Sequence, residues 1–209
     1  MRKLIIILFL LILLIKMLTA CTHRGKVTDD IKIAEYESGF SFVTPITDEE
    51  RKIVAQVSEA VRSARMNGTL NCKDYRFPLP VPIYLIRDRT QPIPKVCGRP
   101  WQCTTDYDSL CALATNSANC QYGFNGLALE NLIFILREGK VCEPLSKFRW
   151  LMTHEGLHKI CNVHHGDQMD IWQKAIEIEL PTMLEPRMRV FSNPSATDIV
   201  RDNCGGMHQ

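Results

Sequence analysis

The sequence predicts an α+β domain in which a small sheet packs against helices. Apolar residues recur at helical spacing in three segments, residues 47–66, 146–160 and 167–180. Short runs rich in β-branched residues at 81–86 and 132–136 predict two buried strands between the first and second helices. The order helix, strand, strand, helix, helix lacks the regular alternation of an α/β fold, so the class that it favours is α+β.

The first 20 residues predict an export signal. Arg2 and Lys3 give a positive start, and Leu4 to Ile15 is an unbroken run of 12 apolar residues. As a helix this run reaches roughly 18 Å, which is short of the ~30 Å hydrocarbon core of a bilayer. We therefore expect a signal peptide at 1–20 rather than a permanent membrane span.

The four residues that end this segment resemble the lipobox of bacterial lipoproteins. They read Leu18-Thr19-Ala20-Cys21, and the resemblance implies cleavage before Cys21 and attachment of lipid to that cysteine. Thr22 follows, and in that family the absence of an aspartate there goes with sorting to the outer membrane. We expect a protein anchored by lipid in the bacterial envelope, at the outer membrane and facing the periplasm or the cell surface. An ordinary signal peptide followed by an unmodified cysteine is the alternative.

The charge of the remaining chain argues against nucleic acid as a partner. The whole chain has 25 Lys and Arg against 23 Asp and Glu, a net charge of +2. Three of the basic residues lie in the signal peptide, so 22 basic residues remain against 23 acidic ones, a net charge of −1. Proteins that bind phosphate backbones have a clear basic excess. The remaining length suits one domain, and we expect a polar tether at 21–44 and the domain at 45–209.

The cysteine count agrees with export to an oxidising compartment. Nine cysteines minus Cys21 leave eight, which allows up to four disulfides. The eight candidates are Cys72, Cys97, Cys103, Cys111, Cys120, Cys142, Cys161 and Cys204. Sequence spacing does not choose among the possible pairings, and Cys204 is one possible partner of Cys161. A cysteine-ligated metal site is disfavoured, because the four cysteines at 97–120 contain no close C-x2-C pair.

Local signals set the expected limits of the first elements. Thr47 to Glu50 has the form of a capping box at the start of the first helix, and Asn67 followed by glycine ends that helix. The cysteine-rich stretch 97–126 contains several turn residues. We expect that stretch to be irregular and stapled by disulfides.

Two helices are expected after Pro144. Ser146 can cap the first of them, which runs to about Ile160. The second begins near Asp167 and ends before Pro181. The apolar face of this last helix consists of Met169, Trp172, Ile176 and Leu180.

The helix at 146–160 contains the metal-ligating motif H-E-x-x-H. His154 and His158 are four residues apart, so both side chains project from one helical face and can bind one ion. Glu155 follows the first histidine, which places its carboxylate beside such an ion, where a bound water would sit. Two exposed helical histidines without a metal are the simpler interpretation of the bare motif.

Two further histidines follow at the distance that a third ligand requires. His164 and His165 stand ten and eleven residues after the first motif histidine. This pattern resembles the zincin metallopeptidases, especially the short-spacer H-E-x-x-H-x-x-x-x-x-H branches, whose third ligand is at the tenth position. Metzincins have a glycine where this chain has Cys161, so Asn162, which tolerates positive φ, is expected to make the left-handed turn. The resemblance implies a zincin-like fold and a Zn²⁺ ion held by the two motif histidines and His164.

Other placements of the third ligand stay open. His165 stands just before the last predicted helix, which carries an aromatic residue, and this resembles the small SprT-like and YgjP-like zincins. Gluzincins have a glutamate about 20 residues beyond the second histidine, and Glu177 and Glu179 lie 19 and 21 residues beyond His158. Metzincins also have a methionine turn beneath the metal, for which Met183 is the candidate.

The function that these signals predict is that of a lipid-anchored zinc metallopeptidase of the bacterial envelope. Zinc lowers the pKa of a bound water to about 7, and Glu155 then accepts its proton as the general base of peptide hydrolysis. The expected partners are a peptide or protein substrate and, through the lipid, a membrane. One alternative is a non-catalytic envelope lipoprotein on a zincin scaffold, with zinc in a structural or partner-binding role. A disulfide-rich binding module without metal is the other.

Overall fold

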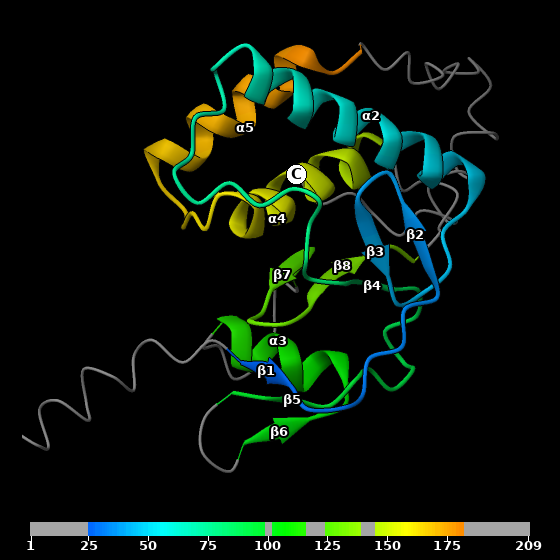
Figure 1. The fold of residues 1–209 in the computed structure, drawn as a ribbon. Coiled ribbons are helices and arrows are strands. Elements are labelled where there is room, and N and C mark those ends of the chain that lie inside the picture. The colour runs from blue at the N-terminus through cyan, green and yellow to red at the C-terminus, as the bar shows by residue number, and fades with distance from the viewer. Residues whose placement is uncertain (1–24, 99–101, 116–123, 139–144, 182–209) are drawn as a thin grey trace, which may run out of the picture.

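The computed structural model describes residues 25–98, 102–115, 124–138 and 145–181 (Figure 1). The predicted signal peptide, the predicted lipobox with Cys21, and Met183 lie outside these residues, as do Cys120, Cys142 and Cys204. Within the described ranges, no helix is both long enough and apolar enough to cross a membrane.

A five-stranded mixed sheet forms the centre of the molecule, with the strand order β2-β3-β4-β8-β7. The two strands that the sequence predicts are its middle: β4 (Ile83–Ile86) and β8 (Ile133–Leu136) pair in parallel. β3 (Phe40–Phe42) continues the sheet in parallel beside β4, and β2 (Glu35–Glu37) pairs antiparallel with β3. β7 (Gly126–Ala128) pairs antiparallel with β8 and forms the opposite edge.

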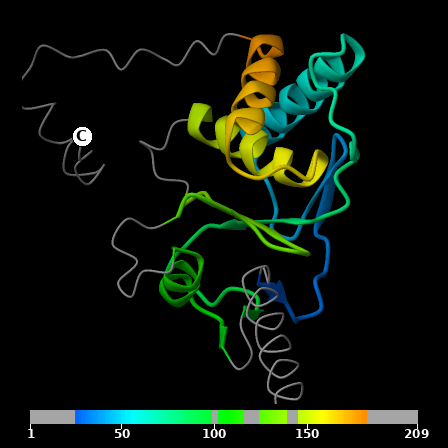
Figure 2. The same cartoon turned by 90° about the vertical axis from the view of Figure 1, so that its left-hand side faces the viewer.

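The central strands are buried on both faces. Ile133 and Ile135 of β8 belong to the core beneath one layer of helices, whereas Phe134 and Leu136 belong to a second core on the opposite face. A strand covered on both sides has a continuous apolar run, which explains why β4 and β8 were recognisable in the sequence. Figures 1 and 2 show the helices on one face as α2 (Asp48–Met66), α4 (Leu145–Ile160) and α5 (Asp167–Glu179), with α3 (Tyr107–Thr115) beyond the other.

The ends of α2 agree with the predicted signals. Thr47 is the N-cap, and its Oγ1 accepts a hydrogen bond from the Glu50 backbone N–H at 3.2 Å. The Glu50 carboxylate in turn accepts one from the Thr47 N–H at 2.9 Å, which completes the capping box. Asn67 is the C-cap. The prediction of this helix is therefore confirmed at both ends.

The cysteine-rich part is more regular than the sequence indicated. β1 (Lys26–Val27), β5 (Val96–Cys97) and β6 (Cys103–Thr104) form a small antiparallel sheet. A disulfide joins Cys97 to Cys103 across neighbouring positions of β5 and β6. The helix α3 follows, and Asp106 Oδ1 accepts a hydrogen bond from the Ser109 N–H at its start. The expectation of irregular structure at 97–126 is thus wrong for these segments, although that of a disulfide staple is confirmed.

The predicted tether at 21–44 is also wrong for its described residues. This stretch contributes β1 to the small sheet and both β2 and β3 to the central sheet. Phe40 and Phe42 are fully buried in the main core. The folded unit therefore includes residues of the range 25–44. These strands have only two or three residues each, too few for a periodic pattern to show in the sequence.

Candidate metal centre

The motif helix α4 is enclosed between the sheet and the helices α2 and α5 (Figure 2). Every residue from Leu151 to His158 is buried. Ser146 was the predicted N-cap of α4, and this prediction is wrong. The helix begins at Leu145, so Ser146 lies within its first turn. Buried polar groups require partners, so the surroundings of the two motif histidines and of Glu155 indicate what each can do.

Among the described residues, three histidines lie close enough together that they could hold one metal ion. Ring nitrogens of His154, His158 and His165 all lie within 4.8 Å of one another. The Nε2 atoms of His158 and His165 are 3.1 Å apart. Two ligands at tetrahedral positions around zinc, with bonds of 2.0–2.1 Å, are separated by roughly 3.3 Å. The spacing of His158 and His165 therefore suits a shared metal ion, and it also suits a hydrogen bond between these two imidazoles.

The hydrogen bonds at Nδ1 decide which nitrogens of the motif histidines can bind a metal. His158 Nδ1 is 2.7 Å from the carbonyl oxygen of Val163, which only accepts, so this nitrogen carries the proton. His154 Nδ1 is 2.8 Å from Oε1 of Gln173 and donates to it. In the neutral tautomer that has its proton on Nδ1, the nitrogen left to bind a metal is Nε2.

Gln173 owes its orientation to Glu177. Its Nε2 donates to a Glu177 carboxylate oxygen at 3.0 Å, which leaves Oε1 to face His154. Gln173 is buried on α5, between Met169 and Ile176. Sequence reasoning missed this residue, although a polar side chain on the predicted apolar face of that helix was a usable signal.

The third histidine of the cluster is His165, the alternative, and not His164, the first choice. α4 ends at Ile160, and Asn162 has φ 48, which is the predicted left-handed turn. Val163 then returns its carbonyl group to His158, and the chain presents His165 to the cluster. The histidine that the geometry brings to the cluster is therefore one residue beyond the preferred candidate.

The glutamates of the gluzincin alternative have other partners. Glu177 accepts the hydrogen bond from Gln173. Glu179 accepts from the side chains of Ser63 on α2 and of Asn67 at its C-cap, both at 2.6 Å. Neither belongs to the histidine cluster of the described residues. Their roles are to orient Gln173 and to join α5 to α2.

Glu155 lies against the edge strand β7. The Ala128 backbone N–H donates a hydrogen bond to its carboxylate. A Cβ atom at Gly126 would overlap this side chain, at 2.6 Å from Cγ and 2.7 Å from Cδ, so only glycine leaves room for it. Burial raises the pKa of Glu155 to about 7, against the opposing effects of the Ala128 hydrogen bond and the Lys159 charge.

The indole of Trp150 covers one face of His154. The two rings are stacked with centroids 4.6 Å apart and an angle of 14° between their planes. Trp150 precedes His154 by one helical turn and is 46% exposed, so its outer face is open to solvent. Together with Gln173, it restricts the orientation of the His154 ring.

The end of α4 is tied by a disulfide. Cys161 pairs with Cys72, which is 89 residues away in the sequence, and both are buried. The predicted disulfide at Cys161 is confirmed, with Cys72 rather than Cys204 as the partner. Cys111 is disulfide-bonded as well.

No protein-family model, no curated protein and no solved structure matches this chain. A functional assignment therefore has to come from the chemistry of the histidine cluster and of Glu155.

Proposed function

We propose that the protein is a zinc-dependent metallopeptidase, with His154, His158 and His165 as the metal ligands and Glu155 as the general base. The observation that carries the proposal is the pair of Nδ1 hydrogen bonds, to Gln173 and to the Val163 carbonyl. Histidines that bind metals almost always donate their other ring N–H to such an acceptor. Unliganded helical histidines do not need both rings to be held in this way.

Zinc suits the three-histidine set because imidazole nitrogens are among its preferred ligands. When bound, zinc would supply a Lewis acid and a site for the attacking water. The cluster of the described residues has three members, and an open fourth position is what a catalytic zinc site requires. His165 is exposed, so substrate and water can approach from its side.

The edge strand β7 supports peptide as the substrate class. Asn125 and Leu129 are hydrogen-bonded to β8, since the Leu136 N–H donates to the Asn125 carbonyl and the Leu129 N–H to the Leu132 carbonyl. In an antiparallel pair such positions alternate, so the backbone groups of Gly126 and Ala128 point away from β8. The Ala128 N–H already donates to Glu155, so an extended peptide would pair with this edge through the other outward backbone groups. Glu155 lies beside these two residues, where it would take the proton from the attacking water.

We also propose that the chain is lipid-anchored in the bacterial envelope, at the outer membrane. The support is the lipobox ending at Cys21 and the presence of disulfides at Cys72–Cys161 and Cys97–Cys103. Disulfides form and persist in oxidising compartments, and the periplasm is one.

The test is a metal analysis joined to a hydrolysis assay on the purified chain. The wild type should contain about one zinc ion per chain and should cleave members of a fluorogenic peptide library, with cleavage lost in chelator and restored by zinc. Glu155→Gln should retain the zinc and lose hydrolysis by about 10²-fold or more, the range of a general base. Zinc-loaded wild type that cleaves no peptide refutes the peptidase, and a chain that binds no zinc refutes the metal site too.

A further inference from the structure

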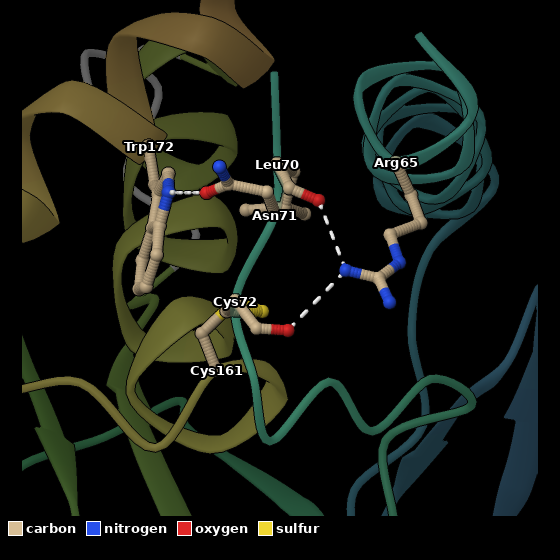
Figure 3. Close-up of a disulfide and its surroundings, with 6 residues drawn as sticks. All are labelled: Arg65, Leu70, Asn71, Cys72, Cys161 and Trp172. Carbon is tan, nitrogen blue, oxygen red and sulfur yellow. Dashed lines mark hydrogen bonds between the residues drawn. A yellow bond between two sulfur atoms is a disulfide. The ribbon is translucent and has the colours of Figure 1, made fainter. Parts of the chain in front are cut away.

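We propose that the disulfide Cys72–Cys161 is the element that positions the third ligand, so that the metal site is complete only after this disulfide has formed. This inference rests on the metal site of the proposed function, and it does not require peptide hydrolysis. Two segments carry it. The ligand loop (residues 161–166) joins α4 to α5 and contains His165, and the strap (residues 70–76) follows α2 and lies beside the end of α4 (Figure 3).

Most of the ligand loop is exposed, and between Cys161 and α5 its one partly buried side chain is that of Val163, which packs against the main core. Asn162 and residues 164–166 are exposed, whereas Cys161 is buried. Two of the three ligands stand on a buried helix, but the third stands on this exposed loop. Segments with few buried contacts open at low cost in free energy. The position of His165 therefore depends on how the ends of the loop are held.

The strap contacts the first residue of the loop and the helix that follows the loop. Cys72 is bonded to Cys161, the first residue of the loop. Beyond the loop, Trp172 Nε1 of α5 donates to Asn71 Oδ1 at 3.3 Å, so the residue next to Cys72 contacts the helix that follows (Figure 3). The Arg76 N–H also donates to the Ile160 carbonyl at 2.7 Å, at the last residue of α4.

The strap is itself anchored to α2. Arg65 Nη1 donates to the carbonyl groups of Leu70 and Cys72, at 3.3 and 3.2 Å (Figure 3). The guanidinium group also lies over the ring of Tyr75, 4.5 Å from its centroid. Leu70 and Cys72 are buried in the main core. The disulfide thus connects a rigid layer of the fold to the first residue of the ligand loop.

The path of the loop also depends on Asn162, directly after Cys161, which has a left-handed backbone conformation. With Cys161 held by the strap and Asn162 at φ 48, the chain turns so that the Val163 carbonyl reaches His158. His165 follows two residues later. Loss of the disulfide frees the start of this turn, and metal binding must then order the loop.

The experiment measures zinc affinity by competition with a chromophoric chelator, on the full chain and its variants. Removal of the strap disulfide, in Cys72→Ala/Cys161→Ala, should weaken zinc binding about tenfold or more, the range for the loss of an interaction that supports a metal ligand. The matched control is the other disulfide, and Cys97→Ala/Cys103→Ala should stay within about twofold of the wild type. Equal affinity of the folded strap variant and the wild type would overturn the proposal.

A double-mutant cycle separates positioning of His165 from general loss of stability. His165→Ala alone should weaken zinc binding severely, and His164→Ala should not. If the disulfide acts through His165, removing it in the His165→Ala background should cause no further loss. A loss of the same size in both backgrounds would show that the disulfide acts elsewhere and would overturn the proposal. With Co²⁺ in place of zinc, the strap variant should show the weaker visible absorption of a site that has lost its third protein ligand.

A second pair of variants covers the case in which the strap variant does not fold. Asn162→Gly keeps the left-handed turn, whereas Asn162→Val disfavours it by roughly 5- to 30-fold in the local equilibrium. Zinc affinity should stay within about threefold of wild type for the first and fall about tenfold for the second. The disulfide is proposed to act by holding the start of this loop. Equal affinities of these two folded variants would show that the start of the loop does not set the position of His165, and would overturn the proposal. Wild type that binds no zinc removes this inference together with the metal site, whereas the expected pattern without any peptide cleavage refutes only the peptidase.

Discussion

Oε1 of Gln173 lies 2.8 Å from Nδ1 of His154, and this contact sets which nitrogen of the histidine is free for a metal. The amide cannot present its N–H group instead, because that group is directed to the Glu177 carboxylate. The hydrogen bonds therefore run in one direction, from His154 to Gln173 and from Gln173 to Glu177. Gln173 contacts His154 at the Nδ1 edge of the ring, not at Nε2.

Gln173→Met should therefore weaken zinc binding about 10- to 100-fold, since an apolar side chain of similar length removes the acceptor. The matched control is Gln168→Met, the same substitution at an exposed position of α5, which should bind zinc like the wild type. Gln173→Glu/Glu177→Gln exchanges the two groups, so it keeps an acceptor beside His154 and a donor between the two positions, and it should recover most of the affinity. Chelator competition measures all three, and equal affinities of the two methionine variants would contradict the role given to Gln173.

The contact between Gly126 and Glu155 gives a second prediction. In Gly126→Ala the new methyl group would overlap the carboxylate, so Glu155 has to leave its place and lose the Ala128 hydrogen bond. We expect a loss of about 1–3 kcal/mol in the free energy of unfolding, the usual cost of overpacking. Zinc affinity should persist because no ligand is touched, while peptide hydrolysis should fall.

Gly156→Ala is the control for that substitution. A Cβ atom there would meet Ile160 Cδ1 at 3.7 Å and Phe40 Cε1 at 3.9 Å, which are ordinary contacts. Gly156 lies inside α4, where alanine is favoured over glycine by about 0.5–1 kcal/mol. Denaturant unfolding should thus rank Gly156→Ala above wild type and Gly126→Ala below it. A Gly126→Ala variant as stable as wild type would mean that the position of the Glu155 side chain does not require glycine at 126.

The sequence was informative where a signal is local. The capping box at Thr47, the turn at Asn67 and the doubly buried strands β4 and β8 each need only a few neighbouring residues. The sequence did not predict the strands before residue 45. Each of them has only two or three residues, and pairing partners such as β4 for β3 are distant in the sequence. No local pattern carries that information.

The residues of the candidate site were likewise predictable where the signal is local and not where it depends on distant parts of the chain. Helical periodicity alone brings His154 and His158 to one face, and the left-handed turn at Asn162 followed from the residue type. The choice between His164 and His165 depends on the path of an exposed loop, and a one-residue change redirects the side chain. The partner of Cys161 is 89 residues away, so spacing could not identify it.

The lipid anchor is tested at Cys21. Cys21→Ser removes the thiol to which the lipid would be attached, so the variant should take up no label from a radioactive or alkyne-tagged fatty acid in a bacterial host. It should also remain unprocessed by the lipoprotein route and run as the larger precursor on a gel. Equal labelling of wild type and variant would contradict the lipoprotein assignment, and the other cysteines provide an internal control because they remain unchanged.

Glu50 provides a prediction for the dependence of stability on pH. Its carboxylate is 1% exposed and accepts hydrogen bonds from Arg87 at 2.6 and 2.7 Å and from Arg137 Nε at 3.1 Å. Burial by itself would raise the pKa of Glu50. The hydrogen bonds from Arg87 and from the Thr47 N–H, with the charges of both arginines, outweigh it and hold the pKa below the ordinary 4.5. The carboxylate joins the start of α2 to the ends of β4 and β8.

Because the pKa of Glu50 is lower in the folded state than in the unfolded state, the unfolded chain binds more protons in acid. The contribution of Glu50 to stability is thus complete above about pH 4.5 and is lost as the pH falls through the lower, folded-state pKa. Glu50→Gln should be less stable than wild type at pH 7 by on the order of 3 kcal/mol, since it leaves two arginines facing an uncharged group. Between pH 7 and pH 3 it should lose less stability than the wild type. Glu49→Gln, at the exposed neighbouring position, should follow the wild type at both pH values, and denaturant unfolding across this range measures all three. An acid-induced loss as large in Glu50→Gln as in wild type would assign that loss to other carboxylates.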